Sequence, residues 1–259
     1  MKKLIPLFII GLLFLTGCGN SKKSNSEKFY DEDAINNLAT SLNNRWEYTD
    51  SKEYNSVDTI DAYKKSTQIE IDTLHTKDFS EKKFKNNKLK ELYLSYENKM
   101  DDIAKMLDTT STISLPEKWF TLYDERTKII TQINSIKEIP VKNKDALKEL
   151  VNNGNEVKET EVIDTKLDAL LSTIKFSEQP QEFQSDYKVY ESNIENTTGK
   201  SFKNLSAKVY LENQDGVRVD TQYINISDWI PGQKVNINFS TNKTFTKTTV
   251  VKDYYTLDN

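Results

Sequence analysis

Between residues 31 and 175, apolar residues recur at every third or fourth position along the chain. This spacing places them on one face of an α-helix, with polar residues on the other faces. The pattern predicts successive amphipathic helices over about 31–46, 57–74, 89–107, 114–139 and 143–174. The most regular stripe belongs to the third of these helices and consists of Leu89, Leu92, Tyr93, Tyr96, Met100, Ile103 and Leu107.

Boundary signals accompany several of these helices. Asp31 or Asp33 is expected to cap the first helix, and Ser114-Leu115-Pro116-Glu117 has the spacing of a capping box before the fourth. Pro140 is expected to end the fourth helix, and Gly154 to interrupt the last. Consecutive amphipathic helices with short connections favour an antiparallel helical bundle over residues 31–175. A coiled-coil or partner-binding surface is the less favoured interpretation, because no heptad pattern continues across the helix boundaries.

The pattern changes after residue 176, where a polar linker over 176–184 precedes segments of alternating apolar and polar residues. These segments are rich in Val, Ile, Thr and Tyr and are bounded by turn sequences, as is typical of β-strands. The expected strands lie at 187–195, 202–211, 217–226, 234–240 and 245–255. Five short strands with hairpin-like turns predict a small antiparallel β-sandwich over residues 185–259.

This second region resembles the FxLYD domain, a small immunoglobulin-like module of exported and lipid-anchored bacterial proteins. The matching features are Asn196-Thr197-Thr198-Gly199, Phe202, Ala207-Lys208-Val209-Tyr210-Leu211, Asp215-Gly216-Val217, Pro231-Gly232-Gln233 and Phe239. The sequence departs from the family at its name-giving motif, where Glu212 and Asn213 stand in place of Tyr and Asp. The resemblance implies an immunoglobulin-like fold and an envelope setting, and it carries over no catalytic residue.

The first residues have the organisation of an export signal. Lys2 and Lys3 precede an apolar run that is short for a transmembrane helix, and small residues follow it. Leu15-Thr16-Gly17-Cys18 resembles the lipobox of bacterial lipoproteins. The resemblance implies a signal peptide over 1–17, cleavage between Gly17 and Cys18, and lipid attachment at Cys18, followed by a flexible tether over 18–30.

Composition excludes several kinds of site. Cys18 is the single Cys and His75 the single His, so neither an intramolecular disulfide nor a zinc site of several thiolates can form. The formal net charge is −4, and only three of the 36 basic residues are Arg, which argues against nucleic acid as a partner. No catalytic, cofactor-binding or metal-binding residue is expected. Some acidic residues could be considered as a general acid and base, but we interpret them as parts of solvated helix faces. They are Asp101, Asp102, Glu117, Asp124 and Glu125.

The sequence therefore predicts a non-enzymatic lipoprotein on the extracytoplasmic face of the cell membrane, held by membrane lipid through Cys18, with an envelope-protein partner that the sequence does not identify. The abundant Lys and Asn favour a low-GC Gram-positive source. A cell-envelope hydrolase or modifying enzyme is the first alternative. A solute-binding lipoprotein of a transporter is the second, although such proteins are usually larger α/β proteins with Gly-rich loops.

Overall fold

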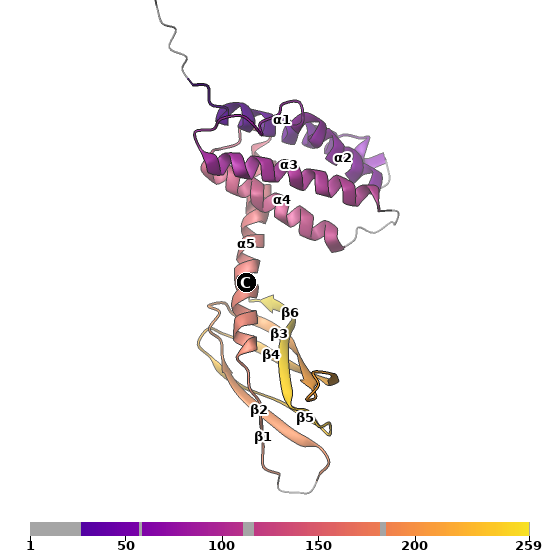
Figure 1. The fold of residues 1–259 in the computed structure, drawn as a ribbon, viewed down its shortest axis with the longest axis vertical. Coiled ribbons are helices and arrows are strands. Elements are labelled where there is room, and N and C mark those ends of the chain that lie inside the picture. Colours follow the sequence, from indigo (N-terminus) through magenta and orange to yellow (C-terminus); the bar gives the residue numbers. More distant parts are fainter. Residues whose placement is uncertain (1–26, 57–58, 111–116, 182–184, 259) are drawn as a thin grey trace, which may run out of the picture.

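A computed structural model describes residues 27–56, 59–110, 117–181 and 185–258. Figure 1 shows helices in one part of the molecule, strands in the other, and one long helix joining them. The helices are α1 (Asp31–Thr49), η1 (Tyr54–Ser56), α2 (Thr59–Leu74), α3 (Asn87–Asp108), α4 (Glu117–Ile136) and α5 (Lys144–Ser172). The strands are β1 (Ser177–Glu178), β2 (Lys188–Glu195), β3 (Phe202–Glu212), β4 (Arg218–Trp229), β5 (Lys234–Thr241) and β6 (Lys247–Leu257).

Several predictions from the sequence fall outside the described residues. They concern the signal peptide at 1–17, the lipidation and cleavage positions Gly17 and Cys18, the tether up to residue 26, and part of the capping box, Ser114 to Pro116. Val57 of the second stripe lies outside them as well. None of the helices described here combines the length and the apolar composition that a membrane-spanning helix requires.

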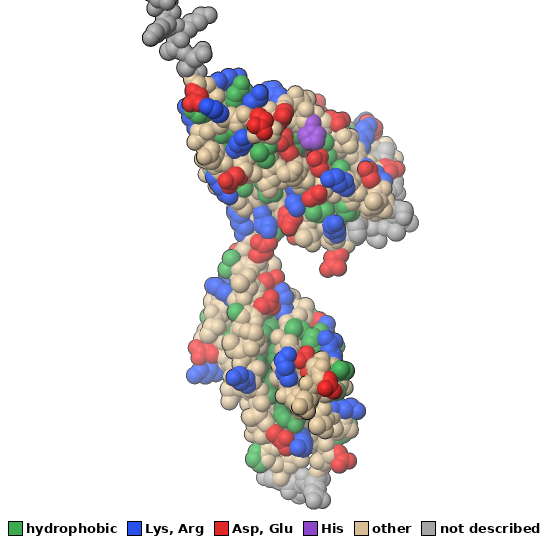
Figure 2. Space-filling view, viewed as in Figure 1, with side chains coloured by type: hydrophobic (Ala, Val, Ile, Leu, Met, Phe, Trp, Pro, Cys, Tyr) green, Lys and Arg blue, Asp and Glu red, His purple; other side chains and the backbone are tan. Residues whose placement is uncertain are grey.

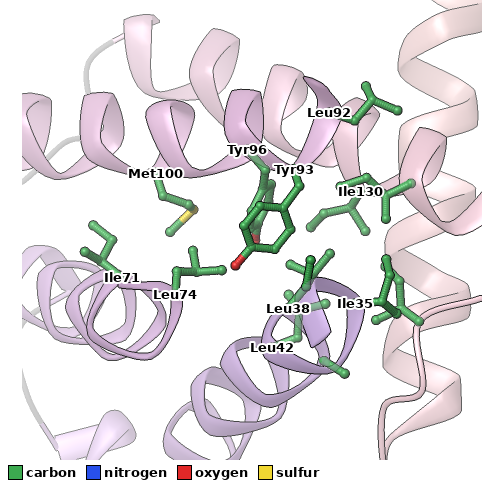
Figure 3. Packing of buried hydrophobic residues seen from close by; sticks show 14 of the residues in the cluster. Ile35, Leu38, Leu42, Ile71, Leu74, Leu92, Tyr93, Tyr96, Met100 and Ile130 are labelled. Atoms are coloured by element: carbon green, nitrogen blue, oxygen red, sulfur yellow. The ribbon is translucent and has the colours of Figure 1, made fainter. Parts of the chain in front are cut away.

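The helical part, α1 to α4 with the first half of α5, surrounds one apolar core. The predicted stripe of α3 is confirmed, because its seven residues are buried, and Ile35, Leu38 and Leu42 of α1 are buried in the same core. Two residues of the later stripes, Ile136 and Val162, are instead exposed. Figure 3 shows Tyr93 and Tyr96 of α3 pointing between the leucines of α1 and α2. Sequential helices lie against one another, so the core is built mainly from contacts between chain neighbours.

Helix ends differ in part from the sequence-based expectation. Neither Asp31 nor Asp33 caps α1, because the cap position is Tyr30 and both aspartates lie in the first turn. The Asp31 carboxylate instead accepts hydrogen bonds from the backbone N–H groups of Lys85 and Asn86, at 2.8 and 3.0 Å. It thereby joins the start of α1 to the loop before α3.

The interruption expected near Gly154 is wrong, because α5 is a continuous helix of 29 residues. Gly154 is buried where α5 crosses α4. A Cβ atom at this position would lie 2.1 Å from Thr131 Oγ1 and 2.8 Å from the Thr127 carbonyl oxygen. The missing side chain therefore allows the two helices to approach closely, and this packing offsets the low helix propensity of glycine.

The strand part contains two antiparallel three-stranded sheets, in the orders β1-β2-β5 and β4-β3-β6. The five longer strands match the predicted ones to within a few residues. In β3, Val209 and Leu211 are buried, whereas Lys208 and Tyr210 lie on the opposite, more exposed face, as the period of two predicts. The hairpin turn expected at Asp215-Gly216 is confirmed, with Gly216 at a φ of 76°.

Buried residues of both sheets belong to one hydrophobic cluster, which includes Phe202, Trp229 and Phe239. The same cluster contains four apolar residues from the end of α5 and the turn after it, Ile163, Leu167, Leu171 and Ile174. The division between the two cores therefore falls inside α5, between Val151 and Ile163, and not at 176–184. The region expected to be a linker contains β1, which pairs with β2.

We expect Gly154→Ala to destabilise the protein by about 1–3 kcal/mol, because the added methyl group would push α5 away from Thr127 and Thr131. Asn155→Ala, at the exposed neighbouring position of the same helix, is the matched control and should leave stability unchanged or slightly raised. Thermal unfolding followed by circular dichroism measures both. A Gly154→Ala variant as stable as the parent protein would contradict the close-approach argument.

Candidate functional site

The most unusual chemistry of the described residues is a charged cluster inside the helical part. Glu70 of α2 is fully buried, and Arg126 of α4 and Arg45 of α1 are only 2% and 8% exposed. Arg45 Nη1 donates to Glu70 Oε2 at 2.8 Å, and Arg126 Nη2 donates to both carboxylate oxygens, at 2.9 and 3.0 Å. The Tyr96 hydroxyl of α3 also donates to Glu70. One carboxylate of α2 thus binds a side chain from each of three other helices, α1, α3 and α4.

Electrostatics explains why Glu70 remains ionised at this depth. Burial opposes its ionisation, but the charges of Arg126 and Arg45 and the hydrogen bond from Tyr96 outweigh burial and hold the pKa of the carboxyl below its ordinary value. Burial raises the pKa of the Tyr96 hydroxyl well above its usual range, so this group stays protonated and donates. The guanidinium of Arg126 also lies 5.6 Å from the ring centres of both Tyr96 and Tyr123.

This cluster holds the helices together, and its polar atoms are directed at one another. Part of this cluster could be recognised in the sequence, because Arg126 continues the apolar stripe of α4 between Leu122 and Ile130. A charged residue on a buried stripe requires a buried partner of opposite charge. Glu70, which precedes the stripe residue Ile71, was not identified as that partner.

A second cluster of acidic residues, Asp78, Glu97 and Asp101, lies in the loop after α2 and on α3. Burial and the nearby carboxylates of Asp78 and Asp101 raise the pKa of Glu97 to about 7, although Tyr93 hydrogen-bonds to it. His75 Nε2 lies 3.7 Å from Asp101 Oδ1 on the same surface. Because a carboxyl with this pKa changes charge near neutral pH, the net charge of this surface becomes more negative as Glu97 deprotonates.

A polar hollow of about 560 Å³ is lined by residues of α4 and α5, beside the place where the two helices pack together. Five of its six charged lining residues are acidic, and Lys128 of α4 pairs with Glu161 of α5. Burial, opposed by Lys128 and assisted by Glu161, raises the pKa of Asp124. The lining residues are Thr121, Tyr123, Asp124, Glu125, Thr127, Lys128, Asn153, Glu156, Val157, Thr160, Glu161 and Asp164.

The acidic residues weighed from sequence are distributed over α3 and α4. Lys99 of α3 bridges Asp102 of its own helix and Glu125 of α4. Asp101 lies beside His75, Asp124 lies in the hollow, and Glu117 is exposed at the start of α4. In the part of the chain that the structure describes, no three His, Cys, Asp or Glu residues are arranged to hold a metal ion. In Figure 2, acidic and basic side chains alternate over the helical surface.

We expect Glu70→Gln to destabilise the protein by about 3–5 kcal/mol, because it leaves two buried guanidinium groups without a counter-charge. The pKa of Glu70 in the folded protein is lowered. Its contribution to the free energy of unfolding is therefore complete above the ordinary carboxyl pKa and is lost as the pH falls through the folded-state pKa. Urea unfolding at neutral pH should therefore show a larger difference than unfolding in acid. Glu53→Gln, which breaks the exposed Lys65–Glu53 pair, is the control and should leave the midpoint almost unchanged.

Glu97→Gln should have the opposite effect. The folded-state pKa of about 7 lies above the ordinary 4.5, so the folded protein loses stability as the pH rises through this range and the carboxylate becomes charged. We expect the melting temperature of Glu97→Gln to exceed that of the parent protein by more at pH 8 than at pH 4.5. Glu91→Gln, at an exposed position of α3, should show no such dependence. A constant difference at both pH values would contradict the assigned pKa.

Comparison with known proteins identifies no relative of this chain. No protein-family model, no curated protein and no solved structure matches it. Function must therefore be inferred from the residues and their arrangement, and the chain is assigned to no family.

Proposed function

We propose that the chain is an exported bacterial lipoprotein, held at the extracytoplasmic face of the cell membrane by acyl chains on Cys18. The sequence Leu15-Thr16-Gly17-Cys18 after a short apolar run supports this proposal, as does the presence of a single Cys. Two or three acyl chains anchor a protein stably, whereas one chain binds only marginally. The lipid then does the work of a membrane-spanning segment.

The observation that carries the proposed role is the position of α5. Its first half packs in the core of the helical part, and its second half packs with the strands. At 1.5 Å per residue, its 29 residues extend about 43 Å. Lys252 of β6 pairs with Asp164 of α5 at 2.6 Å, and Lys166 of α5 donates to the Thr198 carbonyl at 3.2 Å. A helix held in this way at both ends acts as a stiff spacer.

The described chain begins just before α1, on the side of the helical part away from the strands (Figure 1). An anchor at Cys18 therefore holds the helical part next to the membrane, and α5 directs the strand part away from it. The protein then serves to bind or space envelope components without catalysing a reaction. Its partner is most accessible at the strand part.

We further propose that the strand part is an immunoglobulin-like sandwich of the FxLYD kind. The two antiparallel sheets and their common apolar cluster support this assignment. The altered motif is compatible with it, because Asn213 Oδ1 accepts hydrogen bonds from the N–H groups of Asp215 and Val217 in the turn. Glu212 pairs with Lys247 of the adjacent strand β6 at 2.9 Å.

Replacement of Cys18 tests the proposal. The Cys18→Ala variant, expressed in a Gram-positive host, should incorporate no labelled palmitate and should leave the membrane fraction, because no other residue can form the thioether. Ser24→Ala, in the same segment, is the matched control and should be labelled and sediment like the parent protein. Labelling of Cys18→Ala equal to that of the parent protein would exclude lipidation at this residue.

A further inference from the structure

The surface at which the chain enters the helical part is built from two segments distant in sequence. The Tyr30 N–H donates to the Lys83 carbonyl at 2.9 Å, and Asp31 holds the backbone of Lys85 and Asn86. These bonds fix residues 28–31 against the loop of residues 75–86. We call the surface formed by these two segments the entry surface.

Lysines and aromatic rings alternate across the entry surface. The Nζ atoms of Lys28 and Lys82 lie 4.3 and 5.4 Å from the centre of the Tyr30 ring, and Lys85 Nζ lies 5.6 Å from that of Phe29. The two ammonium groups near this ring repel each other, and the carboxylate of Asp33, 3.3 Å from Lys28 Nζ, offsets part of this repulsion. The aromatic rings contribute apolar area directly beside the charges.

Two shallow hollows flank residues 28–31. The first, of about 360 Å³, includes Phe29, Leu89 and Ile136 with Lys85 and Lys137 around them. The second, of about 430 Å³, includes Tyr30 and Phe79 with Lys28, Lys77 and Lys82 around them. Each hollow thus combines apolar side chains with lysines and with carboxylates, which are Asp31 and Glu32 in the first and Asp33 and Asp78 in the second.

The carboxylates of this surface are mostly engaged already. Glu27 pairs with Lys83, Glu32 with Lys137 and Asp33 with Lys28, while Asp31 and Asp78 accept hydrogen bonds from the loop. Glu81 is the remaining exposed acidic residue of the loop. Among the described residues, the exposed lysines Lys77, Lys82 and Lys85 form no ion pair with any of these carboxylates, although hydrogen bonds from Ser80 and the charge of Lys82 lower the pKa of the Asp78 carboxyl. Their ammonium groups are therefore accessible to an external anion.

We propose that the entry surface binds the surface of an anionic phospholipid bilayer, with the headgroup phosphates on Lys77, Lys82 and Lys85 and with Phe29 and Tyr30 at the level of the headgroups. This inference rests on the proposed lipid anchor. Eight residues separate Cys18 from Glu27, and a chain of that length spans at most about 30 Å. The anchor therefore keeps this surface within reach of the bilayer. The ammonium groups of Lys77, Lys82 and Lys85 can there bind the phosphates of the lipid headgroups.

The test uses the chain from residue 19 onward, which contains neither the signal segment nor Cys18. Its binding is measured by co-sedimentation with vesicles of phosphatidylcholine alone or mixed with phosphatidylglycerol. We expect binding to the mixed vesicles only, weakening as salt is added. The variant Lys77→Gln/Lys82→Gln/Lys85→Gln should bind more weakly by about fivefold for each lysine replaced.

The matched control is Lys203→Gln/Lys234→Gln/Lys243→Gln, which removes three exposed lysines of the strand part and should bind like the parent chain. Equal binding to neutral vesicles, salt-insensitive binding, or equal losses in the two triple variants would overturn the proposal. Because these vesicle experiments need no lipid on the protein, their outcome is independent of palmitate labelling at Cys18. The two proposals can therefore fail separately.

Discussion

The helical part depends on one carboxylate. Glu70 accepts hydrogen bonds from Arg45, Tyr96 and Arg126, so side chains of α1, α3 and α4 meet at one residue of α2. A helix that slid by one turn would still present apolar residues of its stripe to the core, although their packing would be less complete. A buried ion does not tolerate such a shift, because every displaced partner leaves a charge without compensation. The cluster therefore favours the helix register in which all three partners reach Glu70.

Much of the secondary structure could be predicted because it depends on local patterns. The stripe of α3 and the alternation of β3 each specify a buried face whatever that face meets, and the structure has both. Contacts between elements that are distant in sequence were harder to predict. The stripe of Ile163, Leu167 and Leu171 has the same period whether it packs on helices or on strands, so the sequence did not reveal that α5 changes partners along its length.

Gly154 and Glu70 illustrate the same limit in two ways. Glycine lowers local helix propensity, and only the position of Thr131 on α4 explains why α5 continues through it. Arg126 could be recognised as an unusual charged residue on an apolar stripe, but its partner Glu70 is 56 residues away in sequence and was not recognised. Pairing of two helix faces is a property of the whole fold, and a single sequence contains no direct record of it.

The division of α5 between two cores also determines which segment could be exchanged as a unit during evolution. A gene fragment beginning at the first long strand would encode a strand part without Ile163, Leu167, Leu171 and Ile174, and its apolar cluster would be exposed where α5 now lies. A transferable unit must begin inside the helix, near residue 158, and the recipient must supply a helix in phase with it. Recombination between proteins of this architecture is therefore constrained by the 3.6-residue period of α5.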